Sequence, residues 1–287
     1  MVKNTACQDI ELKSKKLKIG QISYLNIWPF FYYLKREPFK FSIKYVKNHP
    51  SALNKLLFQD ELDLAPASSF EYLIHSDRYL LFPNLSISAK EAVQSVLLCS
   101  NLPLDSFKKK KNPIVYLSQA SASSINLLKI LWNFYWKLPE PKWTFVKPGE
   151  TKNFPFLEIG DFALNIYYKQ KNNFYIYDLA HEWFKFTNLP FVFALWIINK
   201  NLFFIKKELI YFLYETLIKS KHLLKIEKKH LLQKTKTKFS FDLNVISNYW
   251  DLMDYNLDKE HKASLILFAH YLEKMKIIEG IPTLQWI

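Results

Sequence analysis

The sequence predicts an α/β fold, in which helical crossovers join the strands of a sheet. Over the first two thirds of the chain, short apolar runs of strand length alternate with segments of helical periodicity. From about residue 201 onward the pattern becomes mostly helical. The 287 residues are 49% hydrophobic and 17% aromatic, which allows a large buried core and excludes an intrinsically disordered chain.

Strands are expected where short apolar or alternating runs lie between turn residues. Residues 17–22 form the first such run, and residues 41–46 alternate between apolar and polar side chains as a half-buried strand does. Further strands are expected at residues 62–67, 95–99, 114–117, 143–146, 162–166 and 191–198.

Helices are expected where apolar residues recur at helical spacing. Pro29 supports a helix over residues 28–34, because proline is favoured in the first turn of a helix. The other expected helices cover residues 52–57, 69–75, 123–136 and 262–276. The helices expected at residues 52–57, 69–75 and 123–136 each follow an expected strand, as a crossover helix does.

The positive charge is concentrated in one segment. The chain has 40 Lys+Arg against 26 Asp+Glu, a formal net charge of +14. Residues 201–240 alone hold ten lysines and three acidic residues, while Ile210 and Leu213 show helical spacing, so we expect a helix with a solvated lysine face. Arginine, the usual residue for bidentate contacts to bases and phosphates, occurs only as Arg36 and Arg78. We therefore expect no nucleic-acid partner.

Several other classes are excluded by composition. The four glycines lie too far apart to form a Gly-rich phosphate loop. The two cysteines give no disulfide framework, and the seven histidines show no metal-ligand spacing, so we expect no metal and no cofactor. Residues 1–18 contain five lysines and no apolar signal-peptide core, and no stretch suits a bilayer span. We therefore expect a cytoplasmic protein without membrane insertion.

Small hydroxyl and amide side chains gather at three places where an expected strand meets an expected helix. These are residues 23–26, residues 68–69 and the serine-rich segment 118–124. Ligands of open α/β sheets bind at the carboxyl ends of strands, and helix N-termini attract carboxylates and phosphates. Serine and asparagine are also ordinary N-caps, so capping alone is an alternative interpretation of each junction. Three such junctions favour a small-anion site.

A series of short sequence blocks carries a resemblance to a known family. The blocks are Ile22-Ser23-Tyr24-Leu25-Asn26 with Pro29-Phe30, residues 50–54, 61–66, 68–72, 77–81, 85–88 and 95–98, Ser121-Ala122-Ser123-Ser124, residues 159–164 and 177–179, and Trp183, Thr187 and residues 189–196. In this order they resemble the chorismate dehydratase family of the futalosine route to menaquinone. The similarity is dense over residues 18–198 and thins out afterwards.

Two further comparisons refine this resemblance. The sister family, which forms dihydroxynaphthoate at the end of the same route, opens with a Ser-Pro-Cys-Pro-Asn-Asp type motif that this chain lacks. The dehydratase family usually has glycine where this chain has His49, Gln94 and Asn188. Asparagine tolerates positive φ better than most residues, which suits Asn188 to a glycine position.

The resemblance implies a two-lobe fold of the second periplasmic-binding-protein type, with a ligand cleft between the lobes. Residues 95–99 and 193–198 are interpreted as the two crossover strands. One lobe would then contain residues 1–97 plus 198–287, and the other residues 98–197. A cleft that closes over its ligand excludes water and strengthens contacts with charged groups.

The resemblance also implies a reaction. Chorismate would lose its C3 proton and C4 hydroxyl to give 3-[(1-carboxyvinyl)oxy]benzoate, so that the protein would be a carbon–oxygen lyase whose partner is a small dianion. A non-catalytic solute-binding protein for small anions, built on the same fold, is the alternative. The absence of a signal-peptide and lipidation pattern disfavours that alternative.

The family's functional positions carry over motif by motif. Asn26 and Ser95 are expected to touch the reacting ring as catalytic residues. Ser68 and Ser69 would bind one carboxylate, and Ser123 and Ser124 the other. The remaining expected substrate-site residues are Tyr24, Ser121, Gly160 and Asp161, the last of which either stiffens its loop or faces the ligand.

The proton acceptor is missing from these motifs. The neutral amide of Asn26 has no useful proton affinity and cannot act as a base. It could instead orient the substrate hydroxyl or donate to developing negative charge. One hypothesis is that the enolpyruvyl carboxylate of the substrate removes the C3 proton while the protein acts by positioning.

Overall fold

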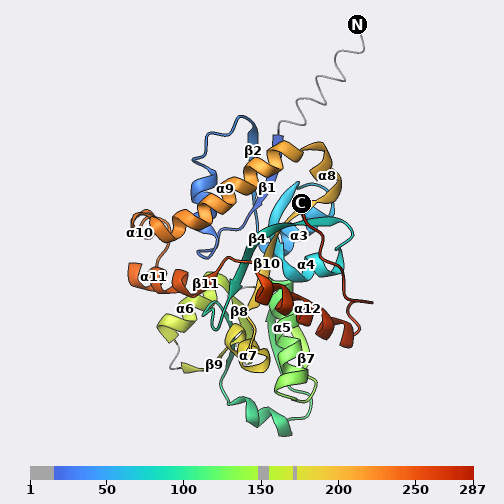
Figure 1. Ribbon diagram of the computed structural model, residues 1–287. Helices are drawn as coiled ribbons and strands as arrows, with labels where there is room; N and C mark the ends of the chain where they lie inside the picture. The colour runs from blue at the N-terminus through green and yellow to red at the C-terminus, as the bar shows by residue number, and fades with distance from the viewer. Residues whose placement is uncertain (1–15, 148–154, 171–172) are drawn as a thin grey trace.

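The strands of the protein form two sheets, one of six strands and one of five (Figure 1). The computed structural model describes residues 16–147, 155–170 and 173–287. Helices pack around both sheets, and the two sheets lie at opposite ends of the molecule in this view. The expected α/β class is therefore confirmed. Among the described residues, none of the helices combines the length and apolar character that crossing a bilayer requires.

The six-stranded sheet has the order β11-β4-β10-β3-β1-β2. Its strands are β1 (Lys16–Gln21), β2 (Ser42–Lys47), β3 (Leu64–Ser68), β4 (Tyr79–Ala89), β10 (Phe191–Asn199) and β11 (Met253–Asp254). The helices that follow the first three strands are α2 (Trp28–Leu34), α3 (Pro50–Phe58) and α4 (Ser69–Ile74). Because β1 pairs in parallel with both β2 and β3, the carboxyl ends of these strands meet at one edge of the sheet.

The five-stranded sheet has the order β7-β6-β8-β5-β9. Its strands are β5 (Val96–Ser100), β6 (Ile114–Ser118), β7 (Lys142–Val146), β8 (Phe156–Ile159) and β9 (Tyr175–Asp178). Its helical segments are the 3-10 helix η1 (Leu104–Lys109), α5 (Ala122–Ile130) with the π-helical turn η2 (Leu131–Tyr135), α6 (Gly160–Gln170) and α7 (Leu179–Thr187).

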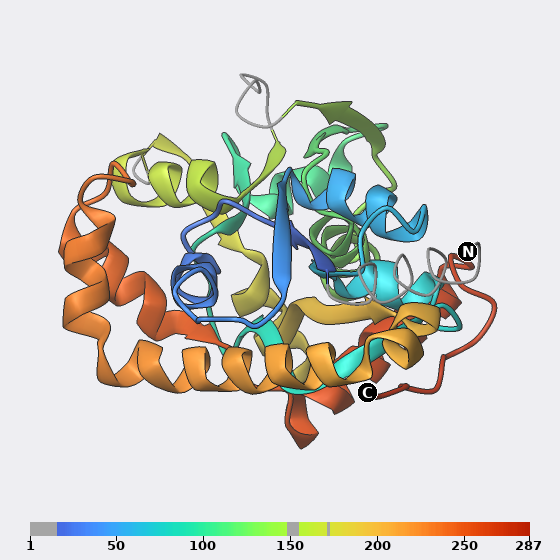
Figure 2. The ribbon, with the colours of Figure 1, turned by 90° about the horizontal axis from the view of Figure 1, so that it is seen from above.

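The C-terminal third is helical and returns to the six-stranded sheet (Figures 1 and 2). Its helices are α8 (Lys200–Ile205), α9 (Lys207–Ile226), α10 (Lys228–Thr235), α11 (Leu243–Leu252) and α12 (Lys259–Lys274). The long helix α9 packs against α2 and runs along one side of the molecule in Figure 2. The end of the chain pairs with β4, where the amide of Leu81 donates to the carbonyl of Gln285 at 2.8 Å.

The chain passes between the two sheets twice, once after β4 and once between β9 and β10. The first passage runs through residues 90–95, and the second includes α7 and residues 188–190. Strand β5 lies wholly in the five-stranded sheet and β10 wholly in the six-stranded sheet. The division into lobes at 97/98 and 197/198 stays a prediction.

One expected strand is wrong. Residues 162–166 belong to helix α6, which begins at Gly160. Phe162 is 53% exposed while Ala163 and Leu164 are buried, a spacing that fits one side of a helix rather than an alternating strand. A short apolar run does not separate the two structures by periodicity alone. The sequence prediction also omitted β4, β8, β9 and the two-residue β11. In β4, Pro83 and Asn84 interrupt the apolar pattern as turn residues do.

Aromatic packing ties the crossover helices to the sheets. Trp196 of β10 is fully buried, and its ring lies 6.1 Å from that of Phe30 and 5.9 Å from that of Phe31, both on α2. Trp183 of α7 is also fully buried and meets Phe191 edge-on at 5.4 Å. These two tryptophans are therefore core residues.

The lysine-rich segment forms the expected helix, but not all of its lysines are solvated. Helix α9 buries Ile210 and Leu213. Lys206, however, is only 11% exposed and pairs with the buried Asp63 at 2.8 Å. Lys221 donates to the carbonyl of Asn84 at 2.7 Å. The segment therefore also anchors the helices to the six-stranded sheet, in addition to carrying surface charge.

Two of the three positions at which the family usually has glycine adopt a left-handed backbone. Gln94 has φ +57° and Asn188 has φ +58°, whereas His49 has φ −70°. Asn188 ends α7 and donates its amide to the carbonyl of Phe184 at 2.7 Å, as a left-handed C-cap does. This chain therefore keeps the backbone geometry of those two turns without glycine.

Candidate active site

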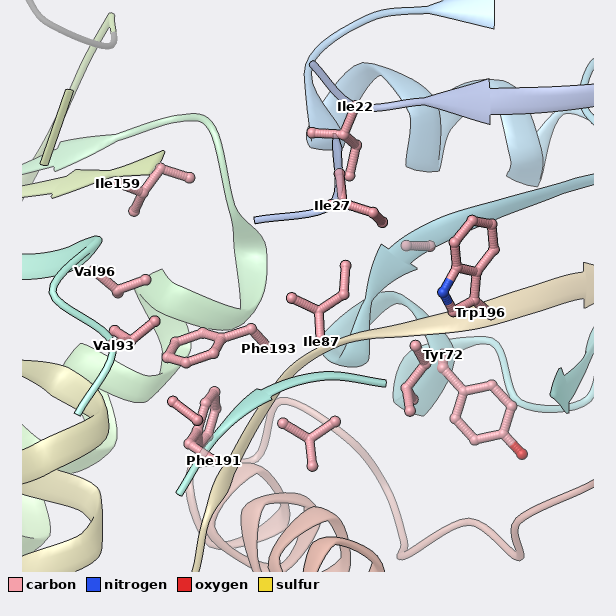
Figure 3. Packing of buried hydrophobic residues seen from close by; sticks show 14 of the residues in the cluster. Ile22, Ile27, Tyr72, Ile87, Val93, Val96, Ile159, Phe191, Phe193 and Trp196 are labelled. Atoms are coloured by element: carbon pink, nitrogen blue, oxygen red, sulfur yellow. The ribbon is translucent and has the colours of Figure 1, made fainter. Parts of the chain in front are cut away.

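A partly open cavity lies between the two sheets. Its apolar wall combines residues of both, and Figure 3 shows Val96 and Ile159 on one side, Ile22 and Ile87 on the other, and Phe193 between them. Its volume is about 60 Å³. The cavity is therefore nearly filled by its own side chains in this conformation.

Polar groups reach the cavity from several loops. The polar lining comprises Tyr24, Asn26, Ser68, Ser95, Ser121 and Ser124, together with the backbone of Gly160. These seven residues were all expected at the substrate site. The other three expected residues, Ser69, Ser123 and Asp161, are absent from the lining. The described residues that line the cavity include no lysine, arginine, histidine or carboxylate.

Asn26 is held by its backbone, so that its side chain remains available. It lies in the turn between β1 and α2, and the hydroxyl of Tyr255 donates to its carbonyl oxygen. Its Oδ1 is shielded from solvent and has no hydrogen-bond partner among the described residues. An amide exposed to a cavity in this way can orient a ligand that enters it.

Ser95 lies at the start of the five-stranded sheet, beside Gly160. Its carbonyl accepts from the amide of Gly160 at 2.8 Å, and its side chain is 2% exposed. The hydroxyl lies 2.8 Å from the hydroxyl of Tyr249 on α11. The residue is therefore fixed by both lobes while it lines the cavity.

The N-terminus of α5 points at the cavity through its first turn. Ser121 caps the helix and accepts from the amide and the hydroxyl of Ser124, at 3.3 and 3.0 Å. Both serines line the cavity. A nine-residue helix with free amides in its first turn favours a negatively charged group at this end.

Ser69 and Ser123 link the two lobes behind the cavity. Their hydroxyls lie 3.0 Å apart, and both side chains are fully buried. Ser69 also donates to the carbonyl of Val192 at 2.7 Å, and Ser123 accepts from the amide of Phe70 at 3.1 Å. Ser68 caps α4 by accepting from the amide of Glu71 at 3.1 Å. The first amides of α4 are therefore already occupied by serine hydroxyls.

Asp161 and Gly160 meet the turn that carries Asn26. The amide of Leu25 donates to Asp161 at 3.1 Å, which joins the two lobes. Burial raises the pKa of Asp161 to about 6, and the hydrogen bond from Leu25 only partly offsets this.

Gly160 has φ +65° and packs under the ring of Tyr24, where a Cβ atom would lie 3.1 Å from the ring. Burial and the carboxylates of Asp161 and Glu158 raise the pKa of Tyr24 to about 12, so its hydroxyl stays protonated.

Sequence reasoning missed the residues that support this turn from behind. Trp250 donates from Nε1 to the carbonyl of Leu25 at 3.0 Å. The hydroxyl of Tyr255 is hydrogen-bonded to the carbonyl of Asn26, and that of Tyr249 to the hydroxyl of Ser95. All three come from a segment beyond residue 198, where the family resemblance is thin. An aromatic residue in an apolar helix is most often a core residue, so composition alone carried no signal for this role.

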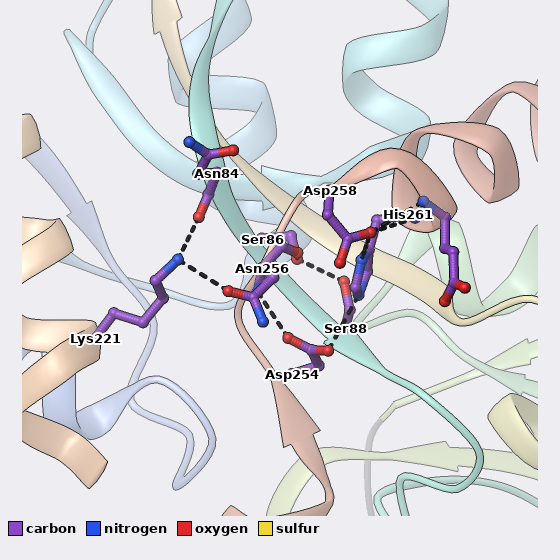
Figure 4. A network of polar contacts seen from close by, with 9 residues as sticks. Asn84, Ser86, Ser88, Lys221, Asp254, Asn256, Asp258 and His261 are labelled. Carbon is purple, nitrogen blue, oxygen red and sulfur yellow. Dashed lines mark hydrogen bonds and ion pairs between the residues drawn. The ribbon is translucent and has the colours of Figure 1, made fainter. Parts of the chain in front are cut away.

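The segment 249–255 is itself anchored by a polar network, shown in Figure 4. His261 of α12 lies 2.8 Å from Asp258 and 3.5 Å from Asp254 of β11. Burial alone would lower the pKa of His261, but hydrogen bonds and charge from Asp254 and Asp258 outweigh it and raise the pKa. The network holds β11 against β4, next to Met253 in the cavity wall.

Asp178 fixes the segment at residues 90–95, through which the chain passes from one sheet to the other. Asp178 caps α7 by accepting from the amide of Ala180 at 3.0 Å. Its other oxygen accepts from the amides of Val93 and Gln94, at 2.9 and 2.6 Å. The loop that leads into Ser95 is therefore tied to the start of α7.

The profile of a family described as menaquinone biosynthesis matches residues 17–274, which is most of the chain. The chain belongs to this family.

Two curated relatives are named chorismate dehydratase. The one from Campylobacter jejuni is 33% identical over 179 residues, which cover 61% of this chain and 64% of the relative. The one from Thermus thermophilus is 30% identical over 204 residues, which cover 64% of this chain and 70% of the relative. The aligned part thus spans about two thirds of these relatives.

Solved structures show the same fold at low sequence identity. A protein from Archaeoglobus fulgidus superposes with a TM-score of 0.71 at 14% identity, covering 92% of this chain and 99% of the other. The periplasmic aliphatic sulphonate binding protein SsuA from Escherichia coli superposes with a TM-score of 0.65 at 14% identity, covering 93% and 94%. The expected periplasmic-binding-protein fold with two lobes is confirmed.

Gly160→Ala is expected to destabilise the closed cleft. An alanine there must adopt φ +65° and bring its Cβ 3.1 Å from the ring of Tyr24. This strain is expected to lower the free energy of unfolding by about 1–2 kcal/mol or more. Thermal unfolding should therefore begin at a lower temperature in this variant. Gly280→Ala is the matched control, because a Cβ there meets nothing within 4 Å. Equal melting temperatures of the two variants would contradict the packing of Gly160 against Tyr24.

Proposed function

We propose that the protein is a chorismate dehydratase, a hydro-lyase that converts chorismate to 3-[(1-carboxyvinyl)oxy]benzoate. The names of the two relatives and the menaquinone family support this proposal. The observation that carries it is the meeting of Asn26 and Ser95, far apart in the sequence, on the wall of one cavity. Five further residues expected from the dehydratase motifs line the same cavity, whereas Ser69, Ser123 and Asp161 do not.

The cavity suits a small dianion even though the described lining has no cation. The N-terminus of α5, with Ser121 and Ser124, offers amides and hydroxyls to one carboxylate of chorismate. Tyr24 and Ser68 bring two further hydroxyls to the cavity. Hydrogen-bond donors fixed in a dry site stabilise charge strongly, because water and its high dielectric constant are excluded.

The reaction breaks two bonds of the ring. The C3–H bond gives its electron pair to the new ring double bond, and the C4–O bond breaks as hydroxide leaves and takes up a proton to form water. The ring becomes aromatic, and one chorismate gives one product and one water. We assign the Ser95 hydroxyl as hydrogen-bond donor to the leaving oxygen, and the Asn26 amide as the group that orients it.

The proton acceptor is then assigned to the substrate. No carboxylate or imidazole occurs among the described lining residues, and the nearby Asp161 is engaged with the amide of Leu25. The enolpyruvyl group of chorismate is attached to C3 through an ether oxygen, so its carboxylate can reach the C3 proton intramolecularly. Holding it in that geometry is the kind of positioning that raises rates strongly.

Substrate entry requires the lobes to separate. The cavity of about 60 Å³ is far smaller than the roughly 300–1,000 Å³ of typical ligand pockets. The contacts between lobes, from Leu25 to Asp161 and from Tyr24 to Gly160, would open and re-form around the ligand. Closure would then exclude water from the reacting ring.

Asn26→Leu is expected to abolish turnover and leave the fold intact. Leucine is similar in size but offers no amide to the substrate, while the backbone carbonyl still accepts from Tyr255. The measurement is formation of the aromatic product from chorismate, followed by ultraviolet absorbance and NMR. Asn201→Leu on the exposed start of α8 is the matched control and should keep full activity. Full activity of Asn26→Leu would remove Asn26 from the site. Tight binding of chorismate by the wild type without product would favour a solute-binding role.

Asp161→Asn tests whether the protein supplies the base. With the substrate carboxylate as base, this variant should keep kcat within about tenfold, since asparagine can still accept from the amide of Leu25. Loss of a true general base costs about 10²–10⁴-fold. Because the pKa of Asp161 is about 6, a base at this position would make kcat/KM rise through pH 6. A rise that is present in the wild type and lost with turnover in Asp161→Asn would overturn the assignment to the substrate.

A further inference from the structure

The hydroxyl of Tyr249 makes one hydrogen bond among the described residues, and its partner is Ser95. The two oxygens lie 2.8 Å apart. Ser95 is 2% exposed and lines the cavity, whereas Tyr249 is 1% exposed and stands behind it. A residue in this position can act on a ligand only through the serine.

The direction of this hydrogen bond follows from the acceptors that each of the two hydroxyls can reach. A buried phenolic O–H that donates to nothing destabilises the folded protein. The described surroundings of Tyr249 offer its hydrogen one acceptor, the Ser95 oxygen. The Ser95 hydroxyl has a second option, because it also faces the cavity. Both hydroxyls have a hydrogen-bond acceptor only if Tyr249 donates to the Ser95 oxygen and the Ser95 hydrogen points at the ligand.

Tyr249 is suited to hold this direction. Burial raises the pKa of its phenol far above the usual range, so the group keeps its proton. The neighbouring residue on α11, Trp250, donates to the carbonyl of Leu25 at 3.0 Å and stacks on Trp28 with the ring planes 4° apart. The end of α11 is thereby fixed against the turn that carries Asn26.

We propose that Tyr249 is a positioning residue, which donates to the Ser95 oxygen and so directs the Ser95 hydrogen at the leaving oxygen of the substrate. This inference rests on the proposed dehydratase function. Because the leaving oxygen gains negative charge as the C4–O bond breaks, a donor fixed in this direction acts more strongly in the transition state than on the bound substrate.

The test is a double-mutant cycle of Tyr249→Phe and Ser95→Ala, with kcat and KM measured for chorismate dehydration. Tyr249→Phe alone is expected to lower kcat about three- to tenfold with KM little changed, the effect of one hydrogen bond. In the Ser95→Ala background the same substitution should leave kcat unchanged, because the tyrosine acts through the serine. A residue with a purely structural role would lower kcat by the same factor in both backgrounds.

Tyr79→Phe is the matched control. Tyr79 is fully buried on β4, and its hydroxyl donates to Glu71 at 3.2 Å, away from the cavity lining. This variant loses a buried hydroxyl as well, so it is expected to lower the melting temperature with kcat unchanged. If Tyr249→Phe does not fold, 3-fluorotyrosine at position 249 replaces it, since it keeps the donor and should retain wild-type kcat.

The outcomes separate the two proposals. Turnover by the wild type with loss in Ser95→Ala, but unchanged kcat in Tyr249→Phe, would overturn the positioning role alone. An equal loss from Tyr249→Phe in both backgrounds, or a loss of kcat with 3-fluorotyrosine, would also overturn it. A wild-type protein that does not turn over chorismate would refute the proposed function, and the positioning role with it.

Discussion

The turn at residues 24–26 is held by three hydrogen bonds that come from distant parts of the chain. Asp161 of the five-stranded lobe accepts from the amide of Leu25, and Trp250 donates to the carbonyl of the same residue. Tyr255 donates to the carbonyl of Asn26. Because the backbone is held from both lobes, the side chain of Asn26 is free to face the cavity. The relative placement of the lobes therefore also sets the geometry of the candidate site.

This dependence explains why the C-terminal helices matter to a site built from the first two thirds of the chain. Strand β11 and α11 lie behind the turn, and the network of His261, Asp254 and Asp258 fixes β11 against β4. The lysine-rich helix α9 contributes Lys221, which donates to the carbonyl of Asn84 on β4 and to the side chain of Asn256 just after β11. Part of the large positive charge thus ties α9 to β4 and to the segment that follows β11.

The absence of a cation from the described lining shapes the chemistry. A dianion in a dry cavity needs many donors, and this chain supplies helix amides and hydroxyls instead of guanidinium groups. In the proposed reaction, neutral donors would also leave the carboxylate of chorismate basic, because no cation neutralises it. A substrate carboxylate that acts as the base and a lining without cations therefore fit together.

Much of the fold could be predicted from the sequence, because strand-length apolar runs followed by capped helices carry a strong local signal. The signal fails at residues 162–166, where a short apolar run suits a strand or a helix, and at β4, where Pro83 and Asn84 resemble a turn. Asn26 and Ser95 were expected at the site from their motifs, and both line the cavity. The roles of the other site residues depend on tertiary contacts that no local pattern reveals. Ser69 and Ser123 carry the same chemistry as Ser121 and Ser124, and only the packing of the two lobes turns their hydroxyls toward each other.

We propose that chorismate binds in this cavity without a cationic partner, with its reacting ring between Asn26 and Ser95. A crystal structure of the Asn26→Leu variant with chorismate tests it most directly. We expect one carboxylate at the N-terminus of α5, the C4 oxygen within hydrogen-bond distance of Ser95, and no lysine or arginine on either carboxylate. Chorismate bound outside the cavity, or carboxylates paired with lysines, would contradict it.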